Sequence, residues 1–430
     1  MEDKIIVGLD IGTTKICVIV GKKNEYGKLE IMGMGKAVSD GVIRGIVTNI
    51  DKTVRAIEKA VAEASDQSGI DIKVVNVGIA GQHIKSAVHH GSITRETDEE
   101  ITIEDLSRLT SDMHRIVTPP GSEIIHVMPQ DYIVDYEDGI MDPVGMTGVK
   151  LEADFHIITA QTNAINNINK CVKKANLKID NLILEPLASS LSVLSEEEKE
   201  AGVCLVDIGG GTTDVAVFYD NIIRHTAVIP FGGNIITADI KQGCMVMEHQ
   251  AELLKTKFGK AIAEEASPNE IVSIPGLRNR PPKEISIKNL AHIIEARMQE
   301  IIELVHTEII TSGYHKKLAA GIVVTGGGSQ LVNLSQLFEY MTGLDTRVGY
   351  PNEHLGRSKV DAAKSPMYAT SVGLVLSGYK ALDMREARYE HEKVSTGSEK
   401  KKTKQGNKFF SNILEKTKGL LIDDFDDKIN

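Results

Sequence analysis

Two glycine-rich turns of this sequence have the composition of a phosphate-binding site. The first turn lies within Asp10–Lys15 and the second within Asp207–Asp214. Glycine has no Cβ, so the backbone N–H groups of such turns stay open to a ligand and form a concave site for anions. Threonine hydroxyls add donors for phosphate oxygens. The predicted phosphate-binding residues are Gly12, Thr13, Thr14, Lys15, Gly209, Gly210, Gly211, Thr212 and Thr213.

An aspartate stands ahead of each turn, at the end of an apolar run. A carboxylate repels phosphate, whereas Mg²⁺ is commonly shared between one or two carboxylates, several waters and the phosphates of a nucleotide. Asp10 and Asp207 are therefore predicted to bind Mg²⁺ through its water molecules. Lys15 is predicted to offset phosphate charge. The two turns together predict a clamp that holds one Mg²⁺–nucleotide from both sides.

A third glycine turn follows later in the chain, at Thr325–Ser329, and is predicted to enter a helix. A helix N-terminus suits an anionic or polar ligand group. The predicted contacts of this turn are Gly326, Gly327, Gly328 and Ser329. The motif G-x-x-x-x-G-K-[ST] is absent from these turns, and neither of the first two turns leads into a helix, so neither a Walker loop nor a dinucleotide fingerprint fits.

The elements that carry the first two turns repeat along the chain. Ile5–Val20 and Val203–Phe218 each contain an apolar run, a Gly-Thr-Thr turn and a second apolar run. Each pattern predicts a β-hairpin with an aspartate at the end of its first strand. Asp207 follows Asp10 by 197 positions. This repeat predicts two similar halves, each of which begins with the same hairpin.

Apolar spacing predicts the other main elements. A helix is expected within Asp51–Ser65 and a strand within Lys73–Ala80. Between His83 and Ala160 the sequence breaks into short β-rich pieces with one helix, Thr102–Arg115, which predicts a small insert within the first half. Two helical stretches are expected in the second half, at about Asn234–Phe258 and Ile287–Gly313.

Composition excludes several classes of protein. The chain has 430 residues, 41% of them apolar, and a net charge of −11, which argues against a general nucleic-acid binder. Its four scattered cysteines are typical of buried thiols in a reducing compartment. Neither a signal peptide nor an apolar run of about 20 residues is found. We therefore expect a cytosolic protein, or one that sits on a membrane surface.

In their order along the chain, the three turns resemble the phosphate and adenosine loops of the actin-like ATPase superfamily. The resemblance implies an α/β actin-like fold with two similar halves around a nucleotide cleft, and ATP with Mg²⁺ as ligands. It also implies that Leu184–Ser190 is the helix that connects the halves. Several relatives have an acidic residue that orients the attacking water at the position of Glu185, the candidate catalytic residue. The alternative is a helix-start carboxylate that interacts with the helix dipole.

Two further residues are assigned from the same relatives, with an alternative for each. Glu252 and Lys255 occupy positions that contact the ribose in relatives. The alternative is a surface ion pair between residues three apart on a helix. Whether the bound ATP is hydrolysed is left open by the sequence, and turnover is expected to be slow at most.

Other segments resemble the FtsA family of bacterial cell-division proteins. They are Gly41–Ile50, Val77–Ile84, Ile124–Asp135, Gly139–Met146 and Gly148–Ala153. The resemblance runs from about Ile5 to Lys380 and returns near the C-terminus. It implies a protein that forms filaments on the inner face of the cell membrane at the division septum, binds the tail of the tubulin-like protein FtsZ and recruits later division proteins.

The same resemblance implies how the chain is divided. The first core subdomain is 1–82 and 162–198 with a return segment at about 366–390, the β-rich insert is 83–161, the second core subdomain is 199–231 and 309–365, and the outer subdomain of the second half is 232–308. The FtsZ tail is expected on this outer subdomain. Arg297 is the candidate contact there, and a solvated charge on a helix is the alternative.

The C-terminal segment is predicted to be a membrane anchor. Residues 391–407 are polar and rich in lysine, which predicts a flexible linker. In 408–422, six large apolar side chains fall within one arc of about 140° on a helix. They are Phe409, Phe410, Ile413, Leu414, Leu420 and Leu421. The segment is therefore predicted to be an amphipathic helix that lies on lipid, and docking on the protein's own core is the alternative.

An acidic end at 423–430 departs from the family pattern, in which the helix ends the chain, and it weakens attraction to anionic lipid. We therefore expect reversible membrane binding that apolar side chains dominate. The alternative function is a small-molecule kinase of the same superfamily, which would have no use for a lipid-binding tail. A heat-shock-type chaperone would need a peptide-binding domain, and the roughly 40 residues after His391 are too few for one.

Overall fold

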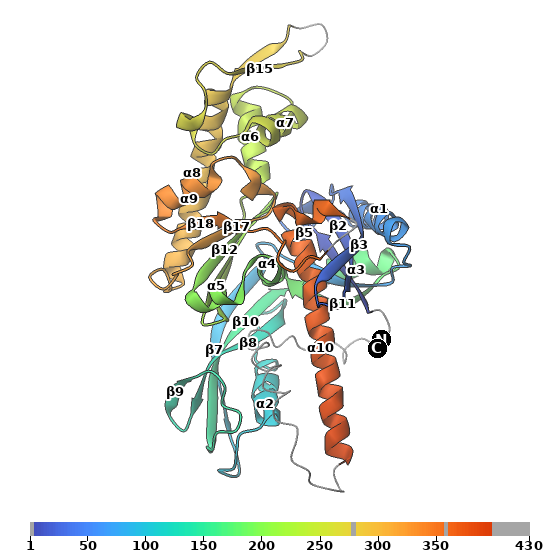
Figure 1. Ribbon diagram of the computed structural model, residues 1–430, viewed down its shortest axis with the longest axis vertical. Coiled ribbons are helices and arrows are strands. Elements are labelled where there is room, and N and C mark those ends of the chain that lie inside the picture. The colour runs from blue at the N-terminus through green and yellow to red at the C-terminus, as the bar shows by residue number, and fades with distance from the viewer. Residues whose placement is uncertain (1–3, 277–280, 357–359, 398–430) are drawn as a thin grey trace.

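The computed structural model describes residues 4–276, 281–356 and 360–397. The predicted membrane helix at 408–422 and the acidic end at 423–430 lie outside the described residues. Figure 1 shows two sheets in the centre of the molecule, a helical region above them and a smaller sheet below. None of the helices in the described part of the chain is long and apolar enough to cross a lipid bilayer.

A five-stranded sheet forms the core of the first half, in the order β11-β6-β1-β2-β3. Its strands are β1 (Ile5–Ile11), β2 (Lys15–Lys23), β3 (Leu29–Val38), β6 (Val74–Ile79) and β11 (Lys178–Leu184). β1 and β2 form the predicted antiparallel hairpin, and β6 runs parallel to β1. Successive residues of β1 are buried because both faces of the sheet are covered, which explains its unbroken apolar run.

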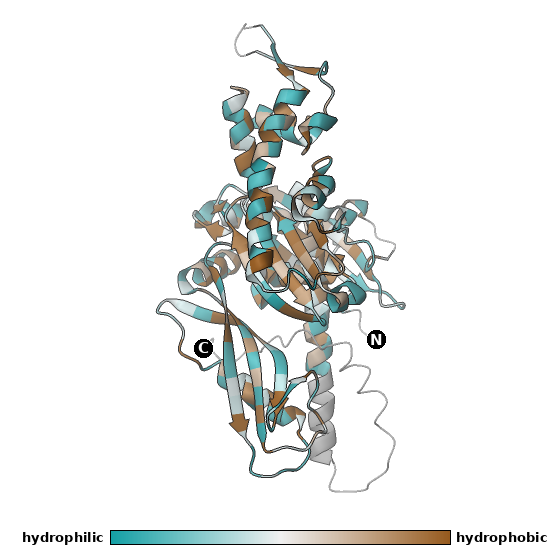
Figure 2. Cartoon of the chain, turned by 90° about the vertical axis from the view of Figure 1, so that its left-hand side faces the viewer, coloured by the Kyte–Doolittle hydropathy of each residue, from teal (hydrophilic) through white to brown (hydrophobic). Residues whose placement is uncertain are grey.

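The second half repeats this sheet strand for strand, in the order β14-β13-β12-β17-β18. Its strands are β12 (Val203–Ile208), β13 (Thr213–Tyr219), β14 (Ile222–Ile229), β17 (Ile322–Thr325) and β18 (Thr346–Val348). The meander β12-β13-β14 corresponds to β1-β2-β3, and β17 runs parallel to β12 as β6 does to β1. The predicted pair of similar α/β halves is confirmed. Figure 2 shows apolar residues concentrated in these central strands.

Helices cover the two sheets. They are α1 (Ile50–Ser68), α3 (Thr162–Lys174), α4 (Glu185–Val193), α5 (Glu196–Ala201), α9 (Leu334–Thr342) and α10 (Ala369–Gly397). Asn49 caps α1 by accepting a hydrogen bond from the backbone N–H of Lys52, and the helix ends at Gly69 in the left-handed region. α4 follows β11 directly, and α10 packs so closely against it that a Cβ on Gly373 would lie 1.9 Å from the carbonyl oxygen of Ala188.

The start of the predicted linker needs a correction. α10 continues to Gly397, so residues 391–397 are helical, and only 398–407 lie outside the described residues. Polar composition predicts flexibility, but glutamate and lysine also have good helix propensity, which lets a helix continue through such a segment. Figure 1 shows this helix projecting past the sheets on the same side as the small lower sheet.

The predicted insert within the first half is confirmed as a four-stranded antiparallel sheet, β7-β10-β8-β9, with one helix. Its elements are β7 (Ile84–Thr94), α2 (Ile103–Met113), β8 (Ser122–Val134), β9 (Glu137–Ile140) and β10 (Lys150–Gln161). The insert has a core of its own, which includes Leu109, Val127 and Phe155. It is therefore a separately packed unit.

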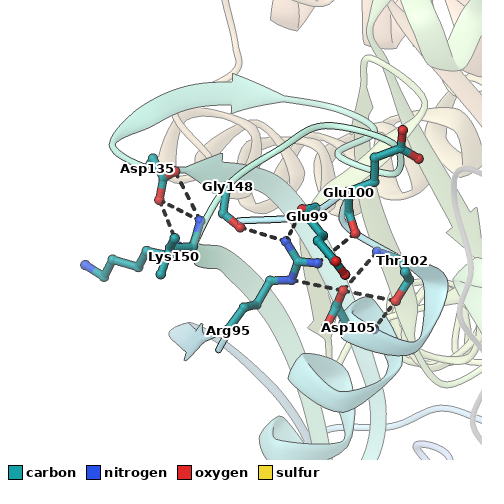
Figure 3. A network of polar contacts seen from close by, with 9 residues as sticks. Arg95, Glu99, Glu100, Thr102, Asp105, Asp135, Gly148 and Lys150 are labelled. Carbon is teal, nitrogen blue, oxygen red and sulfur yellow. Dashed lines mark hydrogen bonds and ion pairs between the residues drawn. The ribbon is translucent and has the colours of Figure 1, made fainter. Parts of the chain in front are cut away.

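One arginine ties the connections of the insert together. The guanidinium of Arg95 donates at 2.7 Å to each of the backbone carbonyls of Glu99, Glu100 and Gly148. Its Nε lies 3.1 Å from a carboxylate oxygen of Asp105 at the start of α2 (Figure 3). These contacts fix the loop before α2 against the loop before β10.

The insert also contacts the second half. Arg224 on β14 forms a two-point ion pair with Asp131 on β8, with N–O distances of 2.7 and 3.2 Å. Nearby, the Ser86 hydroxyl donates to the carbonyl of Thr226, and a ring nitrogen of His156 lies 3.2 Å from the Thr226 hydroxyl. An insert that belongs to the first half in sequence is thus fastened to the second half.

Removing the acidic partner of this ion pair is expected to destabilise the protein. The Arg224 side chain is only 6% exposed, so Asp131→Ala leaves a buried charge without its carboxylate. We expect a loss of about 1–3 kcal/mol in the free energy of unfolding, measured by urea denaturation. Asp138→Ala, on the exposed strand β9, is the matched control and should change little. Equal unfolding midpoints for the two variants would contradict the prediction.

Among the described residues, the outer part of the second half contains three α-helices and a short hairpin. They are α6 (Gly233–Gly243), α7 (Glu248–Phe258), β15 (Ile271–Ile274), β16 (Lys283–Ser286) and α8 (Ile287–Thr311). The single helical stretch predicted at about Asn234–Phe258 is wrong in one respect, since it consists of two helices. Met245 has a φ of 43°, in the left-handed region, which ends α6 and turns the chain before α7 begins.

Candidate functional site

The first two glycine turns contact each other across the two halves. A Cβ on Gly210 would lie 1.8 Å from Oγ1 of Thr14, and one on Gly211 would lie 2.6 Å from Oγ1 of Thr13. Within the second turn, the N–H of Gly209 donates to the carbonyl of Thr212 at 2.9 Å. The structure therefore brings the two predicted phosphate turns together, with bare glycine backbone facing threonine hydroxyls.

The two aspartates ahead of the turns are buried, and one helix contributes a hydroxyl to each of them. At the start of α10, the Ser371 hydroxyl donates to Asp10 at 3.0 Å and the Thr370 hydroxyl donates to Asp207 at 3.1 Å. The Ser189 hydroxyl on α4 also donates to Asp207, at 2.7 Å. Neighbouring residues of α10 thus orient one carboxylate from each half. Sequence reasoning missed these three hydroxyl residues.

Lys15 balances part of this negative charge. Its Nζ lies 3.2 Å from a carboxylate oxygen of Asp10. Burial by itself lowers the pKa of the Lys15 ammonium, but the charge of Asp10 and the hydrogen bond to it outweigh burial and hold the pKa above its ordinary value. Lys15 therefore remains a cation beside the first glycine turn.

Two more carboxylates belong to the same buried cluster. Burial raises the pKa of Asp214 to about 8, and the charge of Asp207 adds to the shift. Burial, with the charges of Asp10 and Asp214, also raises the pKa of Glu185 well above its ordinary value. Asp214 Oδ1 is buried and makes no hydrogen bond with the described residues. Asp214 is the last residue of the second motif, Asp207–Asp214, and the pattern of the two turns does not predict a role for it.

This charge distribution fits a divalent cation. The carboxyl groups of Asp10, Asp207, Asp214 and Glu185 interact in one buried cluster beside the ammonium of Lys15, and Oδ1 of Asp214 makes no hydrogen bond with the described residues. Among the described residues no three acidic, histidine or cysteine side chains are grouped closely enough to hold a metal directly. Carboxyl groups beside glycine turns are a donor set that suits Mg²⁺, because this ion commonly keeps several waters and binds through one or two carboxylates.

The third turn lies against the second half's aspartate. Gly326 has a φ of 81°, and a Cβ there would lie 2.3 Å from Oδ1 of Asp207. Gly327–Gln330 form a short 3₁₀ helix, and Ser329 donates to the carbonyl of Gly326 at 2.8 Å. The expectation that this turn enters a helix directly is therefore only approximate, since α9 starts later, at Leu334.

Glu252 and Lys255 form an ion pair of 2.7 Å on α7. The ammonium of Lys255 also donates at 2.8 Å to the carbonyl of Gly233 and to the hydroxyl of Thr237, both on α6. The N–H of Gly233 in turn donates to the carbonyl of Gly209 in the second glycine turn. Lys255 is thus a packed residue beside that turn, and its predicted ribose contact stays a prediction.

Arg297 on α8 is held within the outer subdomain. Its guanidinium makes a two-point ion pair with Asp239 on α6, at 2.5 and 3.1 Å, and a second pair with Glu300. The side chain is 23% exposed. Its predicted partner contact stays a prediction. The six predicted membrane residues, from Phe409 to Leu421, lie outside the described residues.

Comparison with known proteins identifies close relatives. The chain matches the family model "Cell division protein FtsA" over residues 204–373 and the model "SHS2 domain inserted in FTSA" over residues 81–159. It is 42% identical over 375 residues to the cell division protein FtsA of Pseudomonas aeruginosa, which covers 87% of this chain and 89% of the relative. It is 36% identical over 396 residues to that of Escherichia coli, with 90% and 94% covered.

Solved structures with low sequence identity share the fold. The PilM–PilN type IV pilus biogenesis complex matches with a TM-score of 0.64 and 15% identity, over 87% of this chain and 98% of that one. MreB5 of Spiroplasma citri bound to ADP matches with a TM-score of 0.51 and 14% identity, over 90% and 98%. These likenesses establish the predicted actin-like architecture.

Proposed function

This chain belongs to the FtsA family of actin-like cell-division proteins, and from that premise we propose that it is an ATP-dependent membrane tether for the division machinery. In this proposal it binds Mg²⁺–ATP between its two halves and forms filaments on the inner face of the cell membrane. It links FtsZ filaments to that membrane and recruits later division proteins at the septum.

The observation that carries the nucleotide part is the meeting of the two glycine turns in front of paired, buried aspartates. Backbone N–H groups of both turns and the hydroxyls of Thr13 and Thr14 are donors of the kind that phosphate oxygens accept. Asp10 and Asp207 would hold Mg²⁺ through its waters. The bound ion would neutralise phosphate charge, and Lys15 would add a second positive charge. The turn at Gly326–Ser329 would receive the adenosine.

Turnover in this proposal is slow. Without a bound cation, burial and the charges of Asp10 and Asp214 raise the pKa of Glu185 and so favour its protonated form. A protonated carboxyl does not accept a proton from water, so its role as a water-orienting residue depends on positive charge entering the cluster. Nucleotide binding and cleft closure, rather than rapid hydrolysis, would then control the filament contacts.

The membrane part of the proposal rests on the sequence of the tail. Burial of a large apolar side chain contributes about 1.5–3 kcal/mol when it is complete, and the attraction of a nearby lysine for anionic lipid contributes about 1 kcal/mol. The six apolar side chains together should therefore contribute more to membrane binding than the lysines. One tail would bind reversibly. Several tails on one filament would bind together, which raises the apparent affinity without new contacts.

Electron microscopy on lipid monolayers tests this function. We expect filaments on lipid from the full chain with Mg²⁺–ATP, and none on lipid from a variant that lacks 408–430, although that variant should still bind ATP. A shorter deletion, of 423–430 alone, is the matched control and should retain lipid binding, because it keeps all six apolar side chains. If the variant that lacks 408–430 bound liposomes as well as the full chain does, the prediction that this segment anchors the protein to the membrane would be wrong.

A further inference from the structure

A short β-hairpin with a two-residue turn contacts the first phosphate turn. It consists of β4 (Val42–Ile43) and β5 (Ile46–Val47), with Arg44 and Gly45 at its tip. Both tip residues have positive φ angles, 50° and 75°, as tight hairpin turns require. The N–H of Gly45 donates to Oγ1 of Thr13 at 3.1 Å. The hairpin therefore contacts the same threonine that faces Gly211 of the second turn.

The tip is also fixed from behind. A Cβ on Gly45 would lie 2.5 Å from the carbonyl oxygen of Ala80, and one on Gly81 would lie 2.9 Å from the carbonyl oxygen of Arg44. No side chain fits in either place without movement of the backbone. The hairpin tip is thus held between the first phosphate turn and the end of β6, which fixes the position of the Arg44 backbone.

Arg44 is a free cation at this position. Its side chain is exposed, and it makes no hydrogen bond or ion pair with any residue that the structure describes. Its Cα lies no more than about 5.5 Å from Oγ1 of Thr13, because only one carbonyl carbon separates it from the Gly45 nitrogen. By contrast, the ammonium groups of Lys15 and Lys255 are already engaged by carboxylates.

The direction of the nucleotide decides which phosphate Arg44 would meet. In the proposed function the adenosine lies at Gly326–Ser329, which belongs to the second half. The phosphate chain would therefore extend toward the first half, and its last phosphate would come nearest to Thr13 and the hairpin. We propose that Arg44 binds the terminal phosphate of the bound nucleoside triphosphate and so distinguishes it from the diphosphate.

This inference rests on the proposed nucleotide binding and assigns a residue that the two phosphate turns do not include. An arginine guanidinium donates two parallel N–H groups to phosphate oxygens, a geometry that lysine does not reproduce. A charge-assisted hydrogen bond of this kind corresponds to about a 10- to 100-fold difference in affinity. The difference should be seen only for ligands that carry the third phosphate.

Titration calorimetry of the full chain with Mg²⁺–ATP, a non-hydrolysable ATP analogue and Mg²⁺–ADP tests the assignment. Arg44→Ala should weaken both triphosphates by about 10- to 100-fold and change ADP affinity by less than about 3-fold. Arg44→Lys should recover part of the loss. Arg55→Ala, an exposed arginine on α1, is the matched control and should alter neither affinity.

Thermal unfolding of the two alanine variants shows whether each is folded. We expect both to fold, because the side chains of Arg44 and Arg55 are exposed. Equal losses for ATP and ADP in Arg44→Ala, or no loss for either, would overturn the role of Arg44 while leaving nucleotide binding intact. Wild-type protein that bound neither ATP nor ADP would instead overturn the proposed function, and this inference with it.

Discussion

Gly211→Ala is expected to lower ATP affinity by about 10- to 100-fold, because overpacking of a close contact costs about 1–3 kcal/mol. The new Cβ would lie 2.6 Å from Oγ1, 2.8 Å from Cγ2 and 3.0 Å from Cβ of Thr13. Both branches of the threonine are too close, so rotation of its side chain does not relieve the clash. The two turns must separate, and their donors no longer converge on one phosphate. Titration calorimetry with Mg²⁺–ATP measures the loss.

A double-mutant cycle separates this steric cause from a general effect on folding. Thr13→Ala removes two of the three clashing atoms. In that background, Gly211→Ala should cost less than about 5-fold, although Thr13→Ala lowers affinity by itself. An equal cost of Gly211→Ala in both backgrounds would mean that contact between the turns does not control binding.

Asp214→Asn is expected to stabilise the nucleotide-free protein at neutral and alkaline pH. Burial and the charge of Asp207 raise the pKa of Asp214 from 3.8 to about 8, so the folded protein holds a proton that the unfolded chain releases. The contribution of Asp214 to wild-type stability therefore falls as pH rises between these two values and stays low above pH 8. Asparagine does not titrate, and the gain should reach a few kcal/mol above pH 8, with no such gain near pH 4.

Thermal unfolding of the apo-protein between about pH 5 and 9 measures this difference. Asp66→Asn, an exposed aspartate on α1, is the matched control and should shift the curve little at any pH. The same Asp214→Asn variant should bind Mg²⁺–ATP more weakly, because it removes one of the carboxylates that face the cation. A gain that was the same at pH 5 and pH 9 would contradict the assigned titration.

Three buried histidines should lower the stability of both the wild-type protein and Asp214→Asn at acidic pH. Burial lowers the pKa of His83, His126 and His156 from 6.5 to about 4. Each is neutral when folded and gains a proton on unfolding below pH 6.5, so stability falls as pH drops toward 4. The loss of unfolding free energy at acidic pH is at most about 3 kcal/mol for each histidine. It does not depend on Asp214 and should therefore also be seen in Asp214→Asn.

The sequence by itself identified the parts of this protein that local rules determine. Glycine at a tight turn between apolar runs predicts a hairpin, and the repeat of that pattern 197 residues later predicted two similar halves. The insert and its helix were recognised for the same reason, since strand and helix periodicity extends over neighbouring residues. Local rules failed at Cys244–Met247, where one residue with positive φ divides a helix, and at 391–397, where polar residues continue one.

Only the tertiary structure decided how the site is assembled. Ser371 donates to Asp10 across 361 positions of the chain, and Thr370 donates to Asp207 across 163. The contact between Gly211 and Thr13, and the free position of Arg44 beside the same threonine, likewise join separate segments. Such contacts produce no periodic pattern in the sequence. A hydroxyl or a glycine is required at these positions by the residue that it contacts after folding, and not by its neighbours along the chain.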